Sequence, residues 1–148
     1  MIDDSFGFMV HADVEIRFRD LDAFGHVNNA VYFSYLEMGR VAYMRAMDEA
    51  AGKERDELDF PFILGRASCR YLATASLGQV VRVAVRASSV GNKSFDFEYE
   101  LSNRDTGKLI ATAKTTQVFF DYDAKETRPI PAAVRDLLEK IEGRPLFT

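Results

Sequence analysis

Four consecutive segments after residue 61 alternate apolar and polar residues, and this pattern constrains the fold more than any other feature. The runs VVRVAVRA (80–87) and SFDFEYEL (94–101) show it most clearly. Such a period of two is typical of strands with one buried face. The expected strands span about 62–72, 80–89, 94–102 and 109–121. Because short turns join them, such as NRDTGK with Gly107 available for a positive φ, we expect an antiparallel sheet.

A long helical pattern precedes these strands. There is no proline between Asn29 and about Ala51, and apolar residues recur there at helical spacing. These residues are Phe33, Leu36, Tyr43, Met44 and Met47. Asn28 or Asn29 is expected to be the N-cap, and Gly52 is expected to stand just past the end. A helix of about 20 residues is long for a small domain, so we expect it to be the central one.

The two ends of the chain complete the predicted order. Residues 12–18 alternate like a strand, and residues 131–141 form a short amphipathic helix pattern. The order is then strand, long helix, four strands and a small helix, which predicts an α+β domain with the helix packed on an antiparallel sheet. Such a sheet leaves an edge on which a second copy of the chain can pair.

Charge and cysteine content argue against several classes of protein. A net charge of −4 does not fit a nucleic-acid surface, which needs a concentrated basic face. The single cysteine, Cys69, cannot form an intramolecular disulfide, and MIDDSFGFMVHADVE begins with acidic residues where a signal peptide needs basic ones. No stretch approaches the roughly 20 apolar residues of a membrane span. We expect a cytoplasmic protein that binds neither nucleic acid nor membrane.

Several common catalytic machineries are missing from the sequence. It has no G-x-S-x-G elbow, no Walker loop and no H-E-x-x-H motif. With only two histidines and one cysteine, no metal site is expected, and no cofactor is predicted. Cys69 lies in an alternating segment and is predicted to be a small buried thiol rather than a nucleophile.

The loop DLDAFGHVNN (20–29) before the long helix has more side chains that can take part in a reaction than any other short segment. The free N–H groups of a helix's first turn favour an oxyanion or a polarised carbonyl. Asp22 next to that point can attack a carbonyl carbon or take a proton from water, and His26 can orient the substrate. The same residues can also serve only an Asx-turn and a helix cap. Glu37, three residues before Arg40, fits a simple ion pair along the helix.

The run RFRDLDAFGHVNNAVYFSYLEMGRVAYM (17–44) resembles the N-terminal signature of hotdog-fold acyl-CoA thioesterases of the 4-hydroxybenzoyl-CoA thioesterase type, which include small bacterial long-chain acyl-CoA thioesterases. Plant acyl-ACP thioesterases share a D-x-x-x-H-V-N-N core, present here as Asp22, His26, Val27, Asn28 and Asn29. The order of elements and the chain length fit the same family over residues 8–125. The resemblance implies a hotdog fold, a five-stranded antiparallel sheet wrapped round one long helix, as a single domain over residues 1–148.

The resemblance also implies an activity and a site. Family members hydrolyse an acyl-CoA thioester to a free acid and CoA, and they form dimers or tetramers with each active site at a subunit interface. Asp22 would be the catalytic carboxylate, as general base on water or as nucleophile. The backbone N–H of Asn29 would bind the oxyanion, and His26 matches a histidine of the plant site. Phe24 departs from the plant enzymes, which have an asparagine there.

The run SSVGNKSFDFEYEL (88–101) resembles the strand-turn-strand of the family that contacts the CoA phosphates. Asn92, Lys93 and Ser94 match that turn, where a lysine charge and free N–H groups suit a pyrophosphate. A solvated hairpin turn is the alternative. Arg66 and Arg70 are weaker candidates for nucleotide contacts across an interface.

Two other functions compete with thioester hydrolysis. A non-catalytic acyl-CoA binding module would keep the fold and the turn at Lys93 without turnover. A hotdog hydratase or dehydratase would typically carry Asp-x-Asn-x-x-His, whereas this loop has Asp22 where that pattern needs asparagine. The sequence does not choose between short, long and aromatic acyl groups, between CoA and an acyl carrier protein, or between dimer and tetramer. The aromatic residues near the loop fit either an acyl pocket or the core: Phe24, Tyr32, Phe33 and Tyr35.

Overall fold

The computed structural model describes residues 7–53 and 61–146 of the chain. Its elements are β1 (Val10–Glu15), α1 (Val31–Ala50), β2 (Phe62–Tyr71), β3 (Val80–Val90), β4 (Ser94–Asn103), β5 (Leu109–Asp121), β6 (Glu126–Thr127) and α2 (Ala132–Glu142). A single 3₁₀ turn, Phe18–Asp20, separates β1 from the loop that leads into α1. The predicted order of strand, long helix, four strands and short helix is confirmed.

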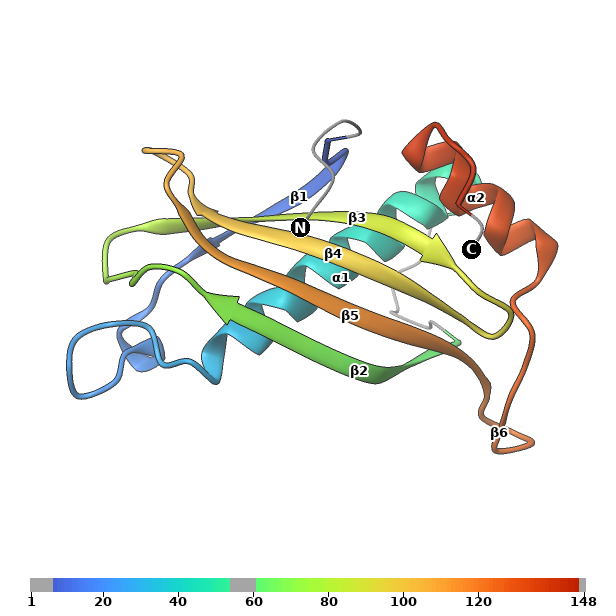
Figure 1. The fold of residues 1–148 in the computed structure, drawn as a ribbon, viewed down its shortest axis with the longest axis horizontal. Coiled ribbons are helices and arrows are strands. Elements are labelled where there is room, and N and C mark those ends of the chain that lie inside the picture. The colour runs from blue at the N-terminus through green and yellow to red at the C-terminus, as the bar shows by residue number, and fades with distance from the viewer. Residues whose placement is uncertain (1–6, 54–60, 147–148) are drawn as a thin grey trace.

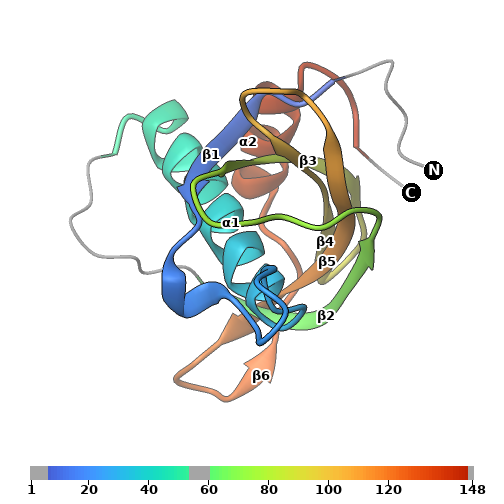
Figure 2. The ribbon, with the colours of Figure 1, turned by 90° about the vertical axis from the view of Figure 1, so that its left-hand side faces the viewer.

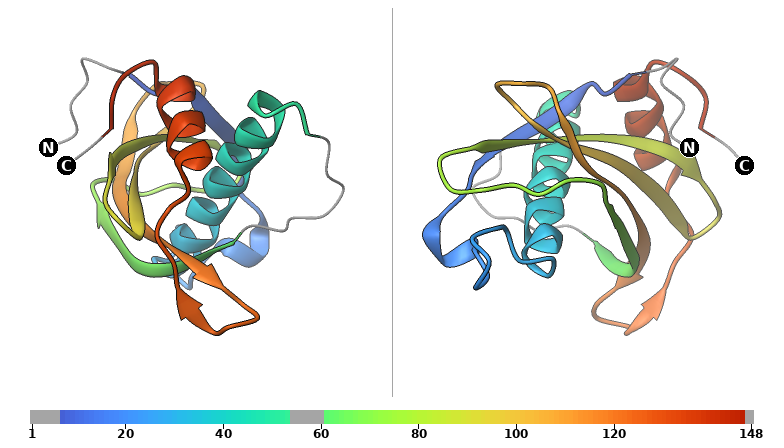
Figure 3. Two further views of the ribbon diagram at one scale, coloured as in Figure 1. Left: turned by 90° about the vertical axis from the view of Figure 1, so that its right-hand side faces the viewer. Right: turned by 60° about the vertical axis from the view of Figure 1, so that its left-hand side comes forward.

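The strands form one antiparallel sheet in the order β1-β3-β4-β5-β2, and β6 pairs with β5 beside this path. Figure 1 shows α1 running across the sheet, and Figures 2 and 3 show the sheet curving round that helix. β1 and β2 are the two edges of this path. The loop before α1 lies at one end of the strands, and the β3–β4 turn lies at the other (Figure 1).

The core lies between α1 and the concave face of the sheet. Alternate residues of β3 and β4 point inward, and Val83 and Tyr99 are fully buried there. Gly39, in the middle of α1, faces them: a Cβ at this position would lie 2.8 Å from Val83 Cγ1 and 3.5 Å from the ring of Tyr99. The absence of a side chain at Gly39 is therefore what lets the helix axis approach the sheet so closely.

We expect Gly39→Ala to lower the free energy of unfolding by about 1 kcal/mol. Overpacking of a filled core costs about 1–3 kcal/mol, against which alanine returns about 1 kcal/mol of helix propensity. Urea unfolding followed by circular dichroism measures the change. Glu49→Ala, an exposed position on the same helix, is the matched control and should be neutral or stabilising. A Gly39→Ala protein as stable as the wild type would mean that α1 can move away from Val83.

The C-terminal helix α2 docks where β3 is irregular. β1 pairs with β3 only as far as Val85, so the Ala87 N–H lies beyond the end of that pairing, next to a register shift between β3 and β4 at Ala87/Ser89. The carboxylate of Glu142 accepts that N–H at 3.0 Å and also accepts the hydroxyl of Tyr43 from α1. Burial raises the pKa of Glu142 against the lowering effect of these hydrogen bonds. One carboxylate thus connects α2, α1 and the bulge in β3.

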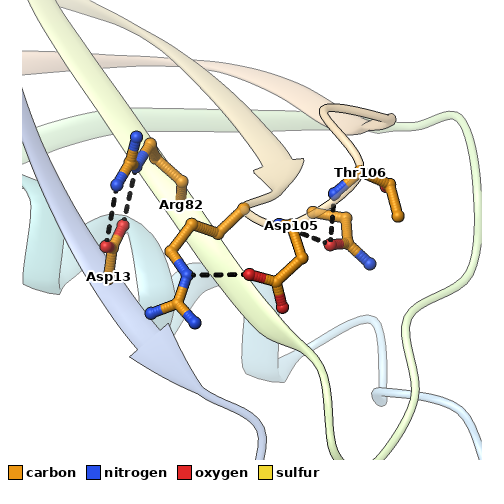
Figure 4. Close-up of polar contacts among 6 residues, drawn as sticks. Asp13, Arg82, Asp105 and Thr106 are labelled. Carbon is orange, nitrogen blue, oxygen red and sulfur yellow. Dashed lines mark hydrogen bonds and ion pairs between the residues drawn. The ribbon is translucent and has the colours of Figure 1, made fainter.

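Ion pairs and turn contacts fix the outer face near β1. Arg82 of β3 donates two hydrogen bonds to Asp13 of β1, at 2.9 and 3.0 Å, across a directly paired position (Figure 4). In the β4–β5 turn, Asn103 Oδ1 accepts the N–H groups of Asp105 and Thr106 (Figure 4). Gly107 follows with φ 77°, as the predicted hairpin turn requires.

Three details of the sequence prediction are corrected. The first strand ends at Glu15 rather than near residue 18, because the chain enters the 3₁₀ turn and leaves Phe18 80% exposed. The N-cap is Ala30, without a side-chain cap, rather than Asn28 or Asn29. The sheet has six strands, since the two-residue β6 was not anticipated. Of the charged segment 52–61, residues 54–60 lie outside the described residues.

Candidate active site

The loop between β1 and α1 is a closed turn held by its own backbone. The Asp22 N–H donates to the His26 carbonyl at 2.8 Å, and the Gly25 N–H returns to the Asp22 carbonyl at 3.1 Å. Gly25 has φ 79°, a value that favours glycine. On the far side, the Val27 N–H donates to the Ala75 carbonyl at 2.9 Å, which ties the loop to the segment before β3.

The carboxylate of Asp22 is oriented by this turn. Its Oδ1 accepts the N–H of Phe24 at 2.9 Å and the N–H of His26 at 3.4 Å, while Oδ2 accepts no hydrogen bond from the described residues. Asp22 and His26 are both exposed. The hydrogen bond between the two residues is made by the backbone N–H of His26. Within the described part of the chain, the His26 imidazole makes no hydrogen bond. The carboxylate is thus presented to the surface with one oxygen fixed and one available.

The start of α1 stands next to this turn. The Asn29 carbonyl accepts the Tyr71 hydroxyl at 2.8 Å, so the end of β2 holds the peptide before the helix. Asn28 Oδ1 accepts the Ala30 N–H at 2.9 Å as an Asx-turn. Among residues 7–53 and 61–146, nothing accepts the N–H of Asn29. This N–H, at the positive end of the helix dipole, can receive a hydrogen-bond acceptor from outside the chain.

Asp20, which sequence reasoning considered only for an Asx-turn, has a larger structural role in this loop. Its side chain is 3% exposed, and its carboxylate accepts the Arg17 N–H at 3.0 Å and the Tyr35 hydroxyl at 2.9 Å. Burial alone would raise the pKa of Asp20, but hydrogen bonds from Arg17 and Tyr35 outweigh it and hold that pKa below its usual range. The Asp20 carbonyl also accepts the Asn28 N–H at 2.9 Å. Asp20 therefore links the 3₁₀ turn, α1 and the entry to the helix.

We expect Asp20→Asn to cost about 1–3 kcal/mol of unfolding free energy at pH 7, the usual cost of disturbing a buried, hydrogen-bonded polar group. The pKa of Asp20 is lower in the folded protein than in the unfolded chain, where it is about 3.9. Ionised Asp20 therefore stabilises the folded protein at pH values above that unfolded-state pKa. This stability is lost as the pH falls through the folded pKa, so the difference from wild type should shrink below about pH 4. Urea unfolding across this pH range measures it. Asp136→Asn, exposed on α2, is the control and should show no such loss.

The aromatic candidates near the loop divide into two groups. Tyr32 and Tyr35 are 2% exposed and belong to the core. Phe24 is 84% exposed at the tip of the loop, and Phe33 lines an open hollow of about 190 Å³ between α1 and β2. Of these four aromatic residues, Phe24 and Phe33 are therefore placed where a ligand could reach them in a single chain.

The β3–β4 turn lies at the opposite end of the sheet from Asp22. β3 has 11 residues and joins the two ends, so the separation is roughly 30 Å. Lys93 Nζ donates to Thr127 Oγ1 at 3.1 Å, and the Asn92 carbonyl accepts the Ile130 N–H at 2.9 Å. The Ser94 carbonyl accepts the Gly91 N–H at 2.8 Å within the turn. A single chain therefore does not bring the two predicted parts of the site together.

The remaining candidates lie away from the loop turn. Arg66 and Arg70 are exposed on the outer face of β2. Cys69 is half-buried rather than fully buried, and burial raises the pKa of its thiol, which suits a structural residue.

Among the described residues, no three His, Cys, Asp or Glu side chains gather as a metal site would require. Likewise, no helix in that part of the chain has the length and apolar character to cross a membrane.

This architecture is the hotdog fold, with a loop carboxylate beside the N-terminus of the central helix. Residues 16–138 match the thioesterase-like superfamily, and the chain belongs to that family. Its relatives include the acyl-acyl carrier protein thioesterase ATL3 of Arabidopsis thaliana, 30% identical over 83% of this chain and 65% of that protein. The long-chain acyl-CoA thioesterase FadM of Escherichia coli is 21% identical over 89% of this chain and 98% of FadM.

Solved structures agree with this assignment. A thioesterase from Thermus thermophilus, determined with coenzyme A and Zn, is 33% identical and superposes with a TM-score of 0.80 over 95% of this chain and 98% of its own. A 1,4-dihydroxy-2-naphthoyl-CoA thioesterase from Synechocystis shares the fold, with a TM-score of 0.70 at 21% identity over 87% of this chain and 94% of its own. The chain spans less than two thirds of some curated relatives, including 56% of YsmA from Bacillus subtilis.

Proposed function

We propose that this protein hydrolyses an acyl-CoA thioester to a free acid and CoA. The observation that carries the proposal is that one loop holds both the oriented Asp22 carboxylate and, at the start of α1, the N–H of Asn29, which has no acceptor among the described residues. A carboxylate and a fixed N–H donor are the two groups that acyl transfer to water needs. Family membership supports the same reaction class.

In the proposed mechanism, the thioester carbonyl oxygen accepts the N–H of Asn29. Charge that develops on this oxygen is stabilised by the helix N-terminus without reorganisation, because Tyr71 and the loop already hold the peptide. Asp22 then takes a proton from water, whose oxygen attacks the carbonyl carbon. The carbon–sulfur bond breaks, and CoA leaves as the thiolate, which takes up a proton. Asp22 as nucleophile would instead form an anhydride that water opens.

His26 is proposed to assist as a substrate-orienting group. Its backbone N–H already contacts the Asp22 carboxylate, and its exposed imidazole stands on the same turn. A ring nitrogen there can donate to the thioester or to the attacking water. In this proposal the side chain of His26 orients the substrate, while its backbone fixes Asp22.

The complete site is proposed to form between two copies of the chain. The roughly 30 Å between the Asp22 loop and the Lys93 turn exceeds the pantetheine arm that joins the thioester to the pyrophosphate. β2 is a sheet edge, and antiparallel pairing of two β2 strands would bring the turn of one copy to the loop end of the other. Exposed apolar side chains lie at this edge and favour such pairing: Phe33 and Leu64.

In this arrangement the CoA phosphates would lie against Asn92, Lys93 and Ser94 of the second copy. The Lys93 ammonium and the turn suit a pyrophosphate. CoA is favoured over an acyl carrier protein as the acyl carrier, because the turn offers a local cation rather than a broad basic face for an acidic protein. A cytoplasmic location remains a prediction of the sequence.

We expect Asp22→Asn to lower kcat/KM for thioester hydrolysis by about 10²-fold or more, the contribution typical of a lost acid–base or nucleophilic group. Thiol release from short, long and aromatic acyl-CoAs measures it, and the best substrate identifies the acyl class. Asp136→Asn serves as the control and should retain wild-type rates. If wild type releases no thiol from any acyl-CoA yet binds CoA, the protein is a binding module and not a hydrolase.

The interface proposal predicts complementation between two inactive proteins. Asp22→Asn should lack hydrolysis, and Lys93→Glu should bind acyl-CoA poorly. In a mixed dimer, one site combines both defects and the other has wild-type Asp22 and Lys93. Refolding an equal mixture should therefore restore about a quarter of the wild-type sites, since half the dimers are mixed and each has one intact site of two. If the mixture is no more active than its separate components, the interface proposal is wrong. Asp22 and Lys93 of the same chain would then belong to one site, or Lys93 would belong to no site.

A further inference from the structure

The hollow between α1 and β2 begins close to the proposed oxyanion donor. It measures about 190 Å³ and is lined on α1 by Phe33, Ser34 and Glu37 among others. Phe33 stands four residues after Asn29, which is about one helical turn. An acyl group whose carbonyl lies at the Asn29 N–H therefore has this hollow beside it.

Most of the hollow is apolar. Phe33 and Leu36 on α1 and Leu64 and Ala67 on β2 provide its walls. The hydroxyl of Thr115, on β5, is occupied by hydrogen bonds to Tyr99 and Gln117 in the core. A cavity of about 150 Å³ lined by apolar side chains can hold a benzene ring. The hollow therefore suits a single ring or a chain of a few carbons.

Glu37 is, among the described residues, the one charged side chain that lines this hollow. It follows Asn29 by eight residues, roughly 12 Å along the helix axis. Helical side chains tilt toward the N-terminus, which favours an approach of the Glu37 side chain to an acyl group that enters from the Asn29 end. The Glu37 side chain is 46% exposed, which makes it accessible from the hollow. It therefore lies at the distance expected for the far end of a short acyl group.

The Glu37 carboxylate is held in place and keeps one acceptor free. Arg40 Nη2 donates to Oε2 at 2.6 Å, and the Arg40 side chain is itself only 21% exposed. Oε1 of Glu37 accepts no hydrogen bond from residues 7–53 or 61–146. An ionised carboxylate only accepts hydrogen bonds, so the free oxygen can pair with an O–H or N–H donor, whereas a second carboxylate has no donor to offer it.

We propose that Glu37 is a specificity-determining residue: it favours short acyl groups that carry a hydroxyl or amino donor at the far end and rejects those that end in a carboxylate. This role rests on the proposed thioesterase function and on the placement of the acyl group in the α1–β2 hollow. The walls of the hollow accept the carbon skeleton, and Glu37 binds the group at its end. Arg40 acts through Glu37 as a positioning residue.

Three CoA thioesters with the same carbon skeleton test the proposal: hexanoyl-CoA, its ω-hydroxy analogue and its ω-carboxy analogue, adipoyl-CoA. For wild type, kcat/KM should be highest for the ω-hydroxy substrate and lowest for adipoyl-CoA. A charge-assisted hydrogen bond predicts steps of roughly 10- to 100-fold. Glu37→Gln should raise the adipoyl-to-hexanoyl ratio by about tenfold or more and reduce the ω-hydroxy preference.

Glu49→Gln, exposed on the same helix, is the matched control and should leave all three ratios unchanged. Circular dichroism and thermal unfolding check that Glu37→Gln is folded. Equal loss for the three substrates in folded Glu37→Gln would overturn the proposal, because Glu37 would then serve the chemistry and not selection. Unchanged ratios would overturn it as well, because the acyl end would not reach Glu37. If wild type releases no thiol from any of the three substrates, the proposed thioesterase function itself is wrong, and so is the role of Glu37 that depends on it.

Discussion

The close packing of α1 against the concave sheet is the constraint on which the rest of the structure depends. A glycine at position 39 lets the helix lie where a side chain would collide with Val83. Because the helix is fixed there, its N-terminus is also fixed relative to the ends of β1 and β2. The Asn29 peptide can then be held by Tyr71 of β2 at one side and by the loop at the other. A packing contact in the core thus sets the position of groups at the surface.

The loop adds a second level of order that the core alone would not supply. Asp20 is buried and gathers hydrogen bonds from Arg17 and Tyr35, whereas Asp22, two residues later, is exposed and oriented outward. The two carboxylates belong to the same short segment but face opposite environments. One anchors the segment to α1, and the other is left available for chemistry. Both assignments follow from which side of the turn each residue occupies.

Much of this organisation could be read from the sequence. The alternation in 80–87 and 94–101 and the proline-free helical run predicted the order of elements, with strand bounds within one residue for β2 to β5. The end of the first strand was predicted too late, because Phe18 continues the apolar–polar alternation past the residue at which the chain turns. The predicted N-cap was wrong as well, because the side chain of Asn28 forms an Asx-turn that ends at Ala30. Whether Asp20 or Asp22 is buried depends on long-range contacts with Tyr35 and the 3₁₀ turn, which no local pattern carries.

The orientation of Asp22 by backbone N–H groups has a consequence for sequence divergence. The groups that hold its Oδ1 belong to the peptides of Phe24 and His26, and any residue other than proline offers the same N–H. The turn depends on one backbone requirement, the positive φ at Gly25. Side chains at 23 and 24 are therefore free to change while the carboxylate stays in place. A lineage can remodel the surface round this carboxylate, and with it the molecules that bind there, without rebuilding the turn.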